Sequence, residues 1–233
     1  STVTVIVTLV DSPSGSVAVR YIRSDLTAGQ LINGVESHPG YSCAADIAFY
    51  YVKSHQVRRN ENVFSAGINI QNIGTKISYT NSEIKDFIPT ILKMGAAYTR
   101  KSDRNNTFSI TADINKLLVP TPPRDTTTYD PGSIIYPGGI NSDKSVIGGI
   151  LASFSDAPGG FKEEIQEISL SVGLEYCLKR SFSLRAGYFY EHENKGNRKF
   201  MTAGAGLRLI IFTFDFSCLN PIVRNHPLAY TRR

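Results

Sequence analysis

The chain alternates apolar and polar residues with a period of two, most clearly between Phe182 and Asp215. Up to Tyr190, and again from Met201, apolar side chains occupy one parity and small or polar side chains the other, with Phe189 the exception. The turn 194–197 (Asn-Lys-Gly-Asn) separates the two arms. Because side chains on a strand point alternately to the two faces of a sheet, this pattern predicts a long hairpin with one apolar and one polar face.

The length of these arms is unusual. Each keeps alternating for about ten residues, whereas an ordinary globular strand ends after about five or six. About ten residues is the length that a tilted strand needs to cross a bilayer, and outer-membrane barrels carry this pattern. A soluble β-sandwich also alternates, so this hairpin alone leaves both architectures open.

The same pattern predicts further strands along the whole chain, separated by turn and loop sequences rich in Gly, Pro, Asn and Asp. Their ranges are 2–9, 16–24, 41–53, 63–72, 91–101, 108–115, 168–176 and 213–219. The longest interruption is 116–164. Within it, residues 144–155 have helix-like apolar spacing, so one short helix is expected in this loop.

The lengths of the connections follow their parity along the chain. Short connections occupy 11–15, 54–61, 102–106, 179–181 and a bend near Ile211. The connections between them are mostly long, at 25–40, 73–90, 116–164, 194–197 and 220–227. Bacterial outer-membrane barrels have short periplasmic turns and longer extracellular loops. The sequence therefore predicts an all-β fold, an antiparallel up-and-down transmembrane β-barrel forming a single domain over residues 1–233, with the long loops extracellular.

Composition agrees with this architecture. Hydrophobic residues make up 41% of the chain, mean hydropathy is −0.14, and no window approaches the roughly 18 apolar residues of a transmembrane helix. Twelve Tyr and twelve Phe suit interfacial girdles. The net charge of +5 comes from short basic clusters in turns (55–59, 100–104 and 179–180), and these form no nucleic-acid-binding motif. The first ten residues lack the features of a signal peptide, so we expect a mature or internal fragment of a longer protein.

The sequence offers little catalytic chemistry. Three cysteines have no paired spacing, and we expect them to pack as small apolar side chains. Glu191-His192-Glu193 falls at a predicted turn and is interpreted as a solvated rim, because consecutive strand residues point to opposite faces. No catalytic residue, metal ligand or cofactor site is predicted. Charged residues on the polar face are expected to point into the barrel lumen: Arg20, Asp46, Asp113, Glu175, Arg185, Arg208 and Asp215.

Several sequence blocks resemble the PorV family, the outer-membrane proteins of the type IX secretion system of Bacteroidetes. They include YIRSDLTAGQ (21–30), AGINIQNIGTKISYT (66–80), SFSDAPGGFKEE (153–164) and LRAGYFYEHENKGNRKF (184–200). The resemblance spans about residues 17–233, and the first fifteen or so residues lie outside it. The family is similar to FadL-like barrels. The resemblance thus implies about the C-terminal two-thirds of such a barrel, which this chain alone would leave incomplete.

The resemblance also implies a function and partners. PorV-like proteins bind the C-terminal secretion domains of cargo at a SprA/Sov-type translocon and pass the cargo to a PorU-type sortase, within outer-membrane lipid. They need no cofactor or nucleic acid, and no enzymatic activity is expected here. Two alternatives are a FadL-like passive channel for hydrophobic small molecules and a lipopolysaccharide O-deacylation factor. Because the loop 116–164 is larger than barrel closure needs, its residues are expected to contact cargo: Pro120, Pro122, Pro123, Tyr129, Tyr136, Phe154 and Phe161.

Overall fold

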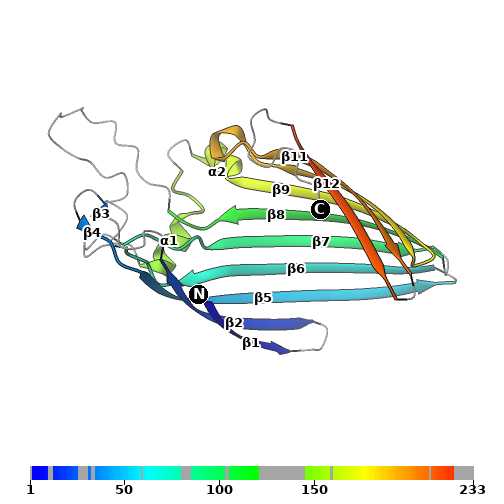
Figure 1. Cartoon of the computed structure of the whole chain (residues 1–233), viewed down its shortest axis with the longest axis horizontal. Helices are drawn as coiled ribbons and strands as arrows, with labels where there is room; N and C mark the ends of the chain where they lie inside the picture. The colour runs from blue at the N-terminus through cyan, green and yellow to red at the C-terminus, as the bar shows by residue number, and fades with distance from the viewer. Residues whose placement is uncertain are drawn as a thin grey trace.

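Ten antiparallel strands form one continuous sheet (Figure 1). The computed structural model describes residues 2–9, 13–25, 31–32, 35–58, 60–79, 85–102, 105–120, 145–157, 160–209 and 211–222. The strands are β1 (Thr2–Leu9), β2 (Ser14–Ser24), β5 (Gly40–Val57), β6 (Asn60–Gly74), β7 (Ile91–Lys101), β8 (Asn106–Leu117), β9 (Ile168–Leu178), β10 (Phe182–Tyr190), β11 (Lys199–Arg208) and β12 (Thr213–Pro221). Each pairs with its neighbour along the chain, so the predicted all-β, up-and-down architecture is confirmed.

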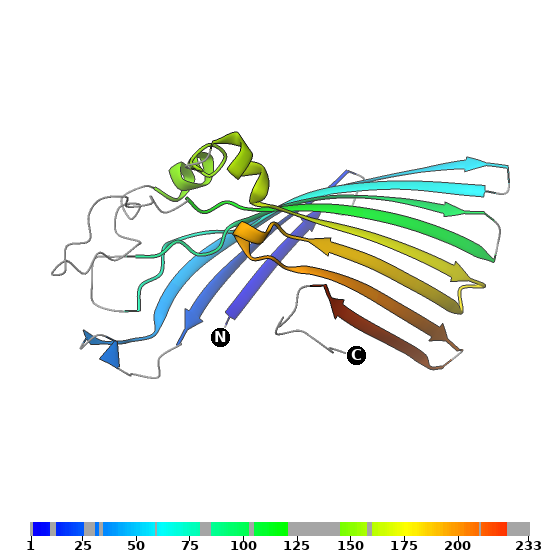
Figure 2. The ribbon, with the colours of Figure 1, turned by 90° about the horizontal axis from the view of Figure 1, so that it is seen from above.

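The sheet is curved and open (Figure 2). Strands β1 and β12 form its two edges, and among the described strands no ladder joins one edge to the other. A separate small hairpin, β3 (Leu31–Ile32) and β4 (Val35–Glu36), lies within the connection from β2 to β5. The sequence predicts only a loop there, because two-residue strands are too short to show any periodicity.

The two ends of the sheet differ. Tight turns join the strands at one end, which we call the turn end. The opposite end, the loop end, carries the long connections and the helices α1 (Val146–Ala152) and α2 (Phe161–Gln166) (Figure 1). A short 3-10 helix, η1 (Glu193–Lys195), lies between β10 and β11.

The long β8–β9 connection carries two helices, so the prediction of one short helix in it is incomplete. The predicted helix at 144–155 corresponds to α1. The second helix, α2, starts directly after Gly160 and has Glu163 and Glu164 in its first turn. Acidic side chains there stabilise a helix through its dipole. The Asp-Ala-Pro-Gly-Gly stretch at 156–160 was expected to end the helix-like run, and its last glycine is also the N-cap residue of a new helix.

Strands β5 and β6 are also longer than the polarity pattern predicts. Residues 54–61 are polar and were expected to form a connection, but the ladder continues through Ser54–Val63, His55–Asn62 and Gln56–Glu61 to Val57–Asn60. Backbone hydrogen bonds hold a ladder together whatever the side chains are, so pairing can outlast the apolar stripe. This hairpin therefore extends beyond its apolar stripe at the turn end.

Burial across the sheet is the reverse of that in a soluble domain. Along β9 the apolar positions are exposed and the Ser, Gly and Glu positions between them are half-buried. Leu170, Leu184 and Leu207 are 43%, 47% and 42% exposed. A soluble sandwich would bury this stripe between two packed layers. Among the described residues no second layer covers these leucines, so they are not part of a dry interior there.

Buried apolar side chains in the described chain lie at the loop end. Ala44, Ile77 and Ile88 form a small cluster there, and Ile22 and Tyr79 pack against it. This cluster anchors the β6–β7 connection across the start of β5. Among the described residues, no helix has the length and apolar character needed to cross a bilayer.

Candidate functional site

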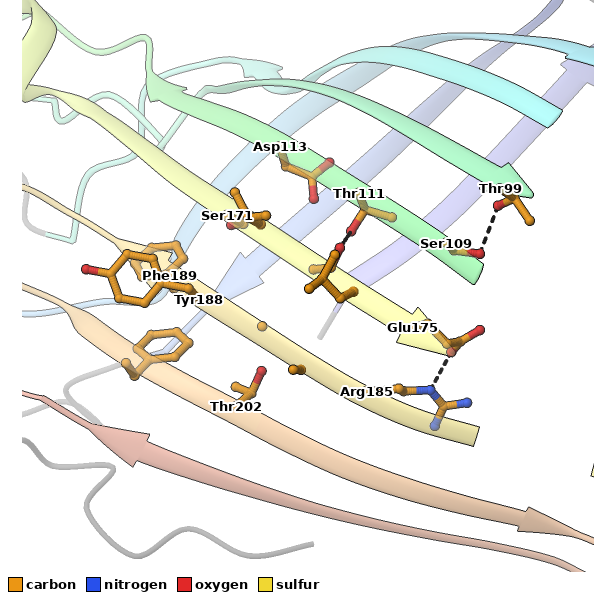
Figure 3. A pocket seen from close by; sticks show the side chains of 16 residues that line it. Thr99, Ser109, Thr111, Asp113, Ser171, Glu175, Arg185, Tyr188, Phe189 and Thr202 are labelled. Carbon is orange, nitrogen blue, oxygen red and sulfur yellow. Dashed lines mark hydrogen bonds and ion pairs between the residues drawn. The ribbon is translucent and has the colours of Figure 1, made fainter. Parts of the chain in front are cut away.

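The polar face of the sheet carries a hollow of about 550 Å³ (Figure 3). Side chains from five successive strands, β7 to β11, line it, among them Thr99, Thr111, Ser171, Arg185 and Thr202. The hydroxyls of Thr99 and Ser109 lie 2.9 Å apart and share a hydrogen bond. The lining therefore combines hydroxyl and charged groups with apolar and aromatic ones such as Phe189 and Phe200.

Arg185 connects three strands across this face. Its Nε donates to Glu175 Oε2 on β9 at 2.6 Å, and its Nη1 donates to Asp215 Oδ1 on β12 at 2.8 Å. Three residues predicted to share the polar face thus form one ion-pair network. Because all three side chains are about half exposed, the network defines the polarity of the face more than it stabilises the fold.

A second ion pair joins β2 to β5. Arg20 pairs with the Asp46 carboxylate, which also accepts a hydrogen bond of 2.8 Å from the backbone N–H of Asn72. The β5–β6 ladder shifts register between Ala45 and Ile47, and Asp46 lies in this irregularity. The bulge thereby directs the carboxylate toward the neighbouring strand.

The two remaining predicted polar-face residues are separate from these networks. The side chain of Asp113 lines the hollow and makes no hydrogen bond or ion pair with any other described residue. Arg208 is the last residue of β11 and lies at the turn end, beside a different hollow.

Five charged side chains at the loop end form a buried network that we call the rim cluster: Lys116, Glu163, Glu164, Glu167 and Lys195. Lys116 Nζ, at the end of β8, lies 2.8 Å from Glu164 Oε2 and 2.7 Å from Glu167 Oε2. Lys195 Nζ, in η1, lies 2.9 Å from Glu167 Oε1 and 3.3 Å from Glu163 Oε1. The cluster therefore fixes α2 between the end of β8 and the β10–β11 connection.

Further contacts complete this docking. Glu164 Oε1 accepts a hydrogen bond of 2.9 Å from the backbone N–H of Ala157, and Asn194 Nδ2 donates to Gln166 Oε1 at 3.1 Å. Both carboxylate oxygens of the buried Glu164 thus have partners. A buried carboxylate is tolerated only when it is paired in this way.

The titration of the cluster reflects this pairing. Burial by itself would raise the pKa of Glu167, but the hydrogen bonds from Lys116 and Lys195 outweigh it and lower this pKa below its ordinary value. Burial would likewise lower the pKa of Lys195, but its hydrogen bonds and charge interactions with Glu167 and Glu163 raise this pKa. Both groups are therefore charged across the neutral range.

Glu191 is buried, so its interpretation as part of a solvated rim is wrong. Strand β10 ends at Tyr190, and Glu191 then accepts two hydrogen bonds of 2.7 Å from Nε and Nη2 of Arg198. This bidentate bond raises the pKa of Arg198. His192 next to it caps η1, its Nδ1 accepting from the backbone N–H of Asn194. Strand parity failed here because the strand had already ended.

The helices α1 and α2 expose large apolar side chains. We call this set the helix patch: Ile147, Leu151, Phe154, Phe161 and Ile165. Phe161 is 81% exposed. On each helix two members lie four residues apart, Ile147 with Leu151 and Phe161 with Ile165, so each pair shares one face of its helix. Phe154 lies in the turn that follows α1. The rim cluster fixes the opposite, acidic side of α2.

The residues predicted to contact cargo have different surroundings. Phe154 and Phe161 belong to the helix patch, whereas Pro120 is buried and lies close to Gly149 of α1. Pro122, Pro123, Tyr129 and Tyr136 lie outside the described residues. Sequence reasoning missed Leu151 and Ile165, although their spacing from Phe154 and Phe161 was a usable signal.

Metal and cysteine chemistry have no visible basis in the described ranges. Within them, no three His, Cys, Asp or Glu side chains gather as they would around a metal ion. Cys43, Cys177 and Cys218 are free thiols.

A family model described as "Type IX secretion system protein PorV" matches residues 2–124 of the chain. Among curated proteins, none matches it. The family match begins at residue 2, in β1. The first fifteen or so residues, which were expected to lie outside the resemblance, therefore belong to the matched region.

Proposed function

The chain belongs to the PorV family of type IX secretion system proteins, and on that basis we propose that it is an outer-membrane component of this system that binds cargo without catalysing a reaction. It recognises the C-terminal secretion domain of a cargo protein at the translocon and passes that cargo to the surface sortase complex. The loop end faces the outside of the cell, and the turn end faces the periplasm.

The observation that carries the membrane placement is the reversed burial of the sheet. The apolar side chains on one face are exposed, and no second layer from the described part of the chain covers them. In water such a surface would drive aggregation, whereas against acyl chains it is satisfied. The hollow on the opposite face is lined by hydroxyls and charges, as a barrel interior would be.

Aromatic residues add support at the turn end. On the apolar face, each strand from β6 to β12 except β11 carries one near its short turn: Phe64, Tyr98, Phe108, Tyr176, Phe182 and Phe214. Phe64 pairs with Tyr98, and Phe108 pairs with Tyr176, across neighbouring strands. Aromatic rows of this kind lie at the membrane–water interface of outer-membrane barrels.

The helix patch supports cargo binding. A patch of exposed Leu, Ile and Phe side chains on and beside two short helices is typical of a protein-binding surface. Because the rim cluster fixes α2, its members Phe161 and Ile165 are already held in place before a partner arrives. Preorganisation lowers the entropy that binding costs.

Co-purification with a cargo secretion domain tests this function. The variant F154S/F161S/I165S should lose capture of the purified domain in detergent and still run as a folded, heat-modifiable band. The control S155A/K162A changes exposed polar residues of the same segment and should keep capture. Normal capture by the triple variant would contradict the proposed role of the patch.

A further inference from the structure

A second hollow, of about 580 Å³, lies at the turn end. Lys179, Arg180 and Arg208 line one part of it, and Leu209, Ile211 and Phe212 line another. Ile211 is 83% exposed. Two separate turns build the hollow, and a backbone hydrogen bond of 2.6 Å from Arg208 N–H to the Ser181 carbonyl joins them.

The three cations carry unopposed charge. Within the described part of the chain, none of their side chains has a hydrogen bond or ion pair. The acidic residues of the adjoining strands, Glu175 and Asp215, are both paired with Arg185 on the polar face. Three cations around one hollow repel one another, so a bound anion would relieve the repulsion.

The backbone supplies an independent observation. Lys179 and Arg180 have φ values of 52° and 55°, in the left-handed region that long side chains rarely adopt. Among the described residues, the other non-glycine residues with positive φ are Asn72 and Asn197 at the loop end, where asparagine suits this conformation, and Arg58 in the β5–β6 turn. Of these turns, the β9–β10 turn has two such cations in succession. The β9–β10 turn therefore places two long cations where asparagine or glycine would be less strained. Strained backbone of this kind clusters at functional sites.

We propose that this hollow binds the phosphate headgroup of an anionic phospholipid, a proposal that rests on the membrane placement proposed above. The cations hold the phosphate, while Leu209, Ile211 and Phe212 contact the acyl chain near the glycerol. The aromatic row containing Phe182 and Phe214 brings the apolar face of the sheet to the same end. A free phosphate would use only the cations and would leave these apolar side chains exposed to water.

Lipid retention in detergent tests the site. The full chain is folded in dodecyl maltoside, phosphatidylglycerol or phosphatidylcholine is added, and native mass spectrometry reports the lipid that stays bound. The wild type should retain phosphatidylglycerol preferentially. Each cation near an anionic headgroup contributes about fivefold in affinity, so K179Q/R180Q/R208Q should bind phosphatidylglycerol about 100-fold more weakly.

Two further variants distinguish lipid binding at this hollow from a general effect of the positive charge of the chain. R58Q/K93Q/R100Q removes the same charge away from the hollow and should keep most of the retention. K179R/R180K/R208K keeps the charge within the hollow and should bind like the wild type. An equal loss of phosphatidylglycerol retention in K179Q/R180Q/R208Q and R58Q/K93Q/R100Q would overturn the proposal. Inorganic phosphate binding as tightly as phosphatidylglycerol would also overturn it, because the site would then be one for a free anion.

The folded state distinguishes this inference from the proposed function. A wild-type chain that inserts into the micelle without preferring phosphatidylglycerol would overturn the lipid site alone. One that never inserts would overturn the membrane placement and the lipid site with it.

Discussion

The surroundings of single residues show how the loop end is built. Gly196 has a φ of 132°, and a Cβ at this position would overlap the Glu191 carboxylate. The glycine therefore leaves room for the bidentate pair of Glu191 with Arg198. One small residue thus controls whether a buried carboxylate keeps its partner.

Replacing this glycine tests that dependence. G196A should lower the free energy of unfolding by about 2–3 kcal/mol, because it adds backbone strain and displaces a charged hydrogen-bonded group. Gly160 offers a matched control, since its φ is also positive, at 66°, and a Cβ there would meet nothing within 4 Å. Its φ and ψ of 66° and −155° lie in a region that is nearly exclusive to glycine, so G160A should cost about 1–2 kcal/mol of backbone strain, without the steric overlap that G196A adds. Denaturant unfolding of both variants measures the difference, and equal losses would contradict the steric argument.

At the scale of the element, the rim cluster couples α2 to two separate connections. The buried side chain of Lys116 forms ion pairs with Glu164 and Glu167. Its removal therefore leaves Glu164 buried without a cation. K116M should weaken the docking of α2 by about 3–5 kcal/mol, the usual cost of removing one partner of a buried pair. Amide hydrogen exchange in residues 160–167 should speed up accordingly.

Lys162 is the control for this experiment. It lies on the same helix, is exposed, and has no ion pair or hydrogen bond with another described residue. K162M should leave exchange in α2 unchanged. Equal acceleration in both variants would show that the cluster does not hold the helix.

The docking of α2 should also depend on pH, in a direction that the pKa of Glu167 sets. Because this pKa is lowered from 4.5 in the folded state, the carboxylate stabilises α2 at any pH above 4.5 and loses that contribution as the pH falls further. The raised pKa of Lys195 keeps its contribution until the pH rises above 10.5. The protection factors of the α2 amides, which are corrected for the intrinsic pH dependence of exchange, should therefore stay constant between these values and fall in acid. A fall in protection already between pH 6 and 8 would point to a different titrating group.

The elements also show what a sequence can and cannot reveal. Long alternating strands such as β9 were predictable, because one face is uniformly apolar and the other uniformly small or polar. The extra length of β5 was not, since its last pairs are polar on both faces and only the backbone ladder holds them. The rim cluster was hidden for a different reason. Its members come from three segments separated by long connections, and no local spacing brings Lys116 near Glu164.

At the scale of the whole molecule, the two edges and the two faces of the sheet limit the surroundings in which it is stable. In the proposed membrane placement every backbone N–H and C=O must find a partner, so the edges of β1 and β12, which pair with no further described strand, would both require pairing within the bilayer. The faces impose a second condition, because apolar side chains must meet acyl chains and the polar face must meet water or protein. Both conditions follow from the membrane placement and would not hold for a sheet in solution.

Paired substitutions on β9 test which face meets lipid. Leu174 is exposed on the apolar face near the middle of the strand, and Ser171 lies on the polar face with Asp113 as its cross-strand neighbour. L174K should destabilise the protein folded in lipid vesicles by about 2–4 kcal/mol, because it moves a charge into the hydrocarbon. S171K should cost little, since its ammonium faces the polar hollow and can pair with Asp113. Urea titrations of the heat-modifiable band measure both values. Should S171K be the more damaging substitution, the assignment of the two faces would have to be exchanged, and the lipid-facing stripe with it.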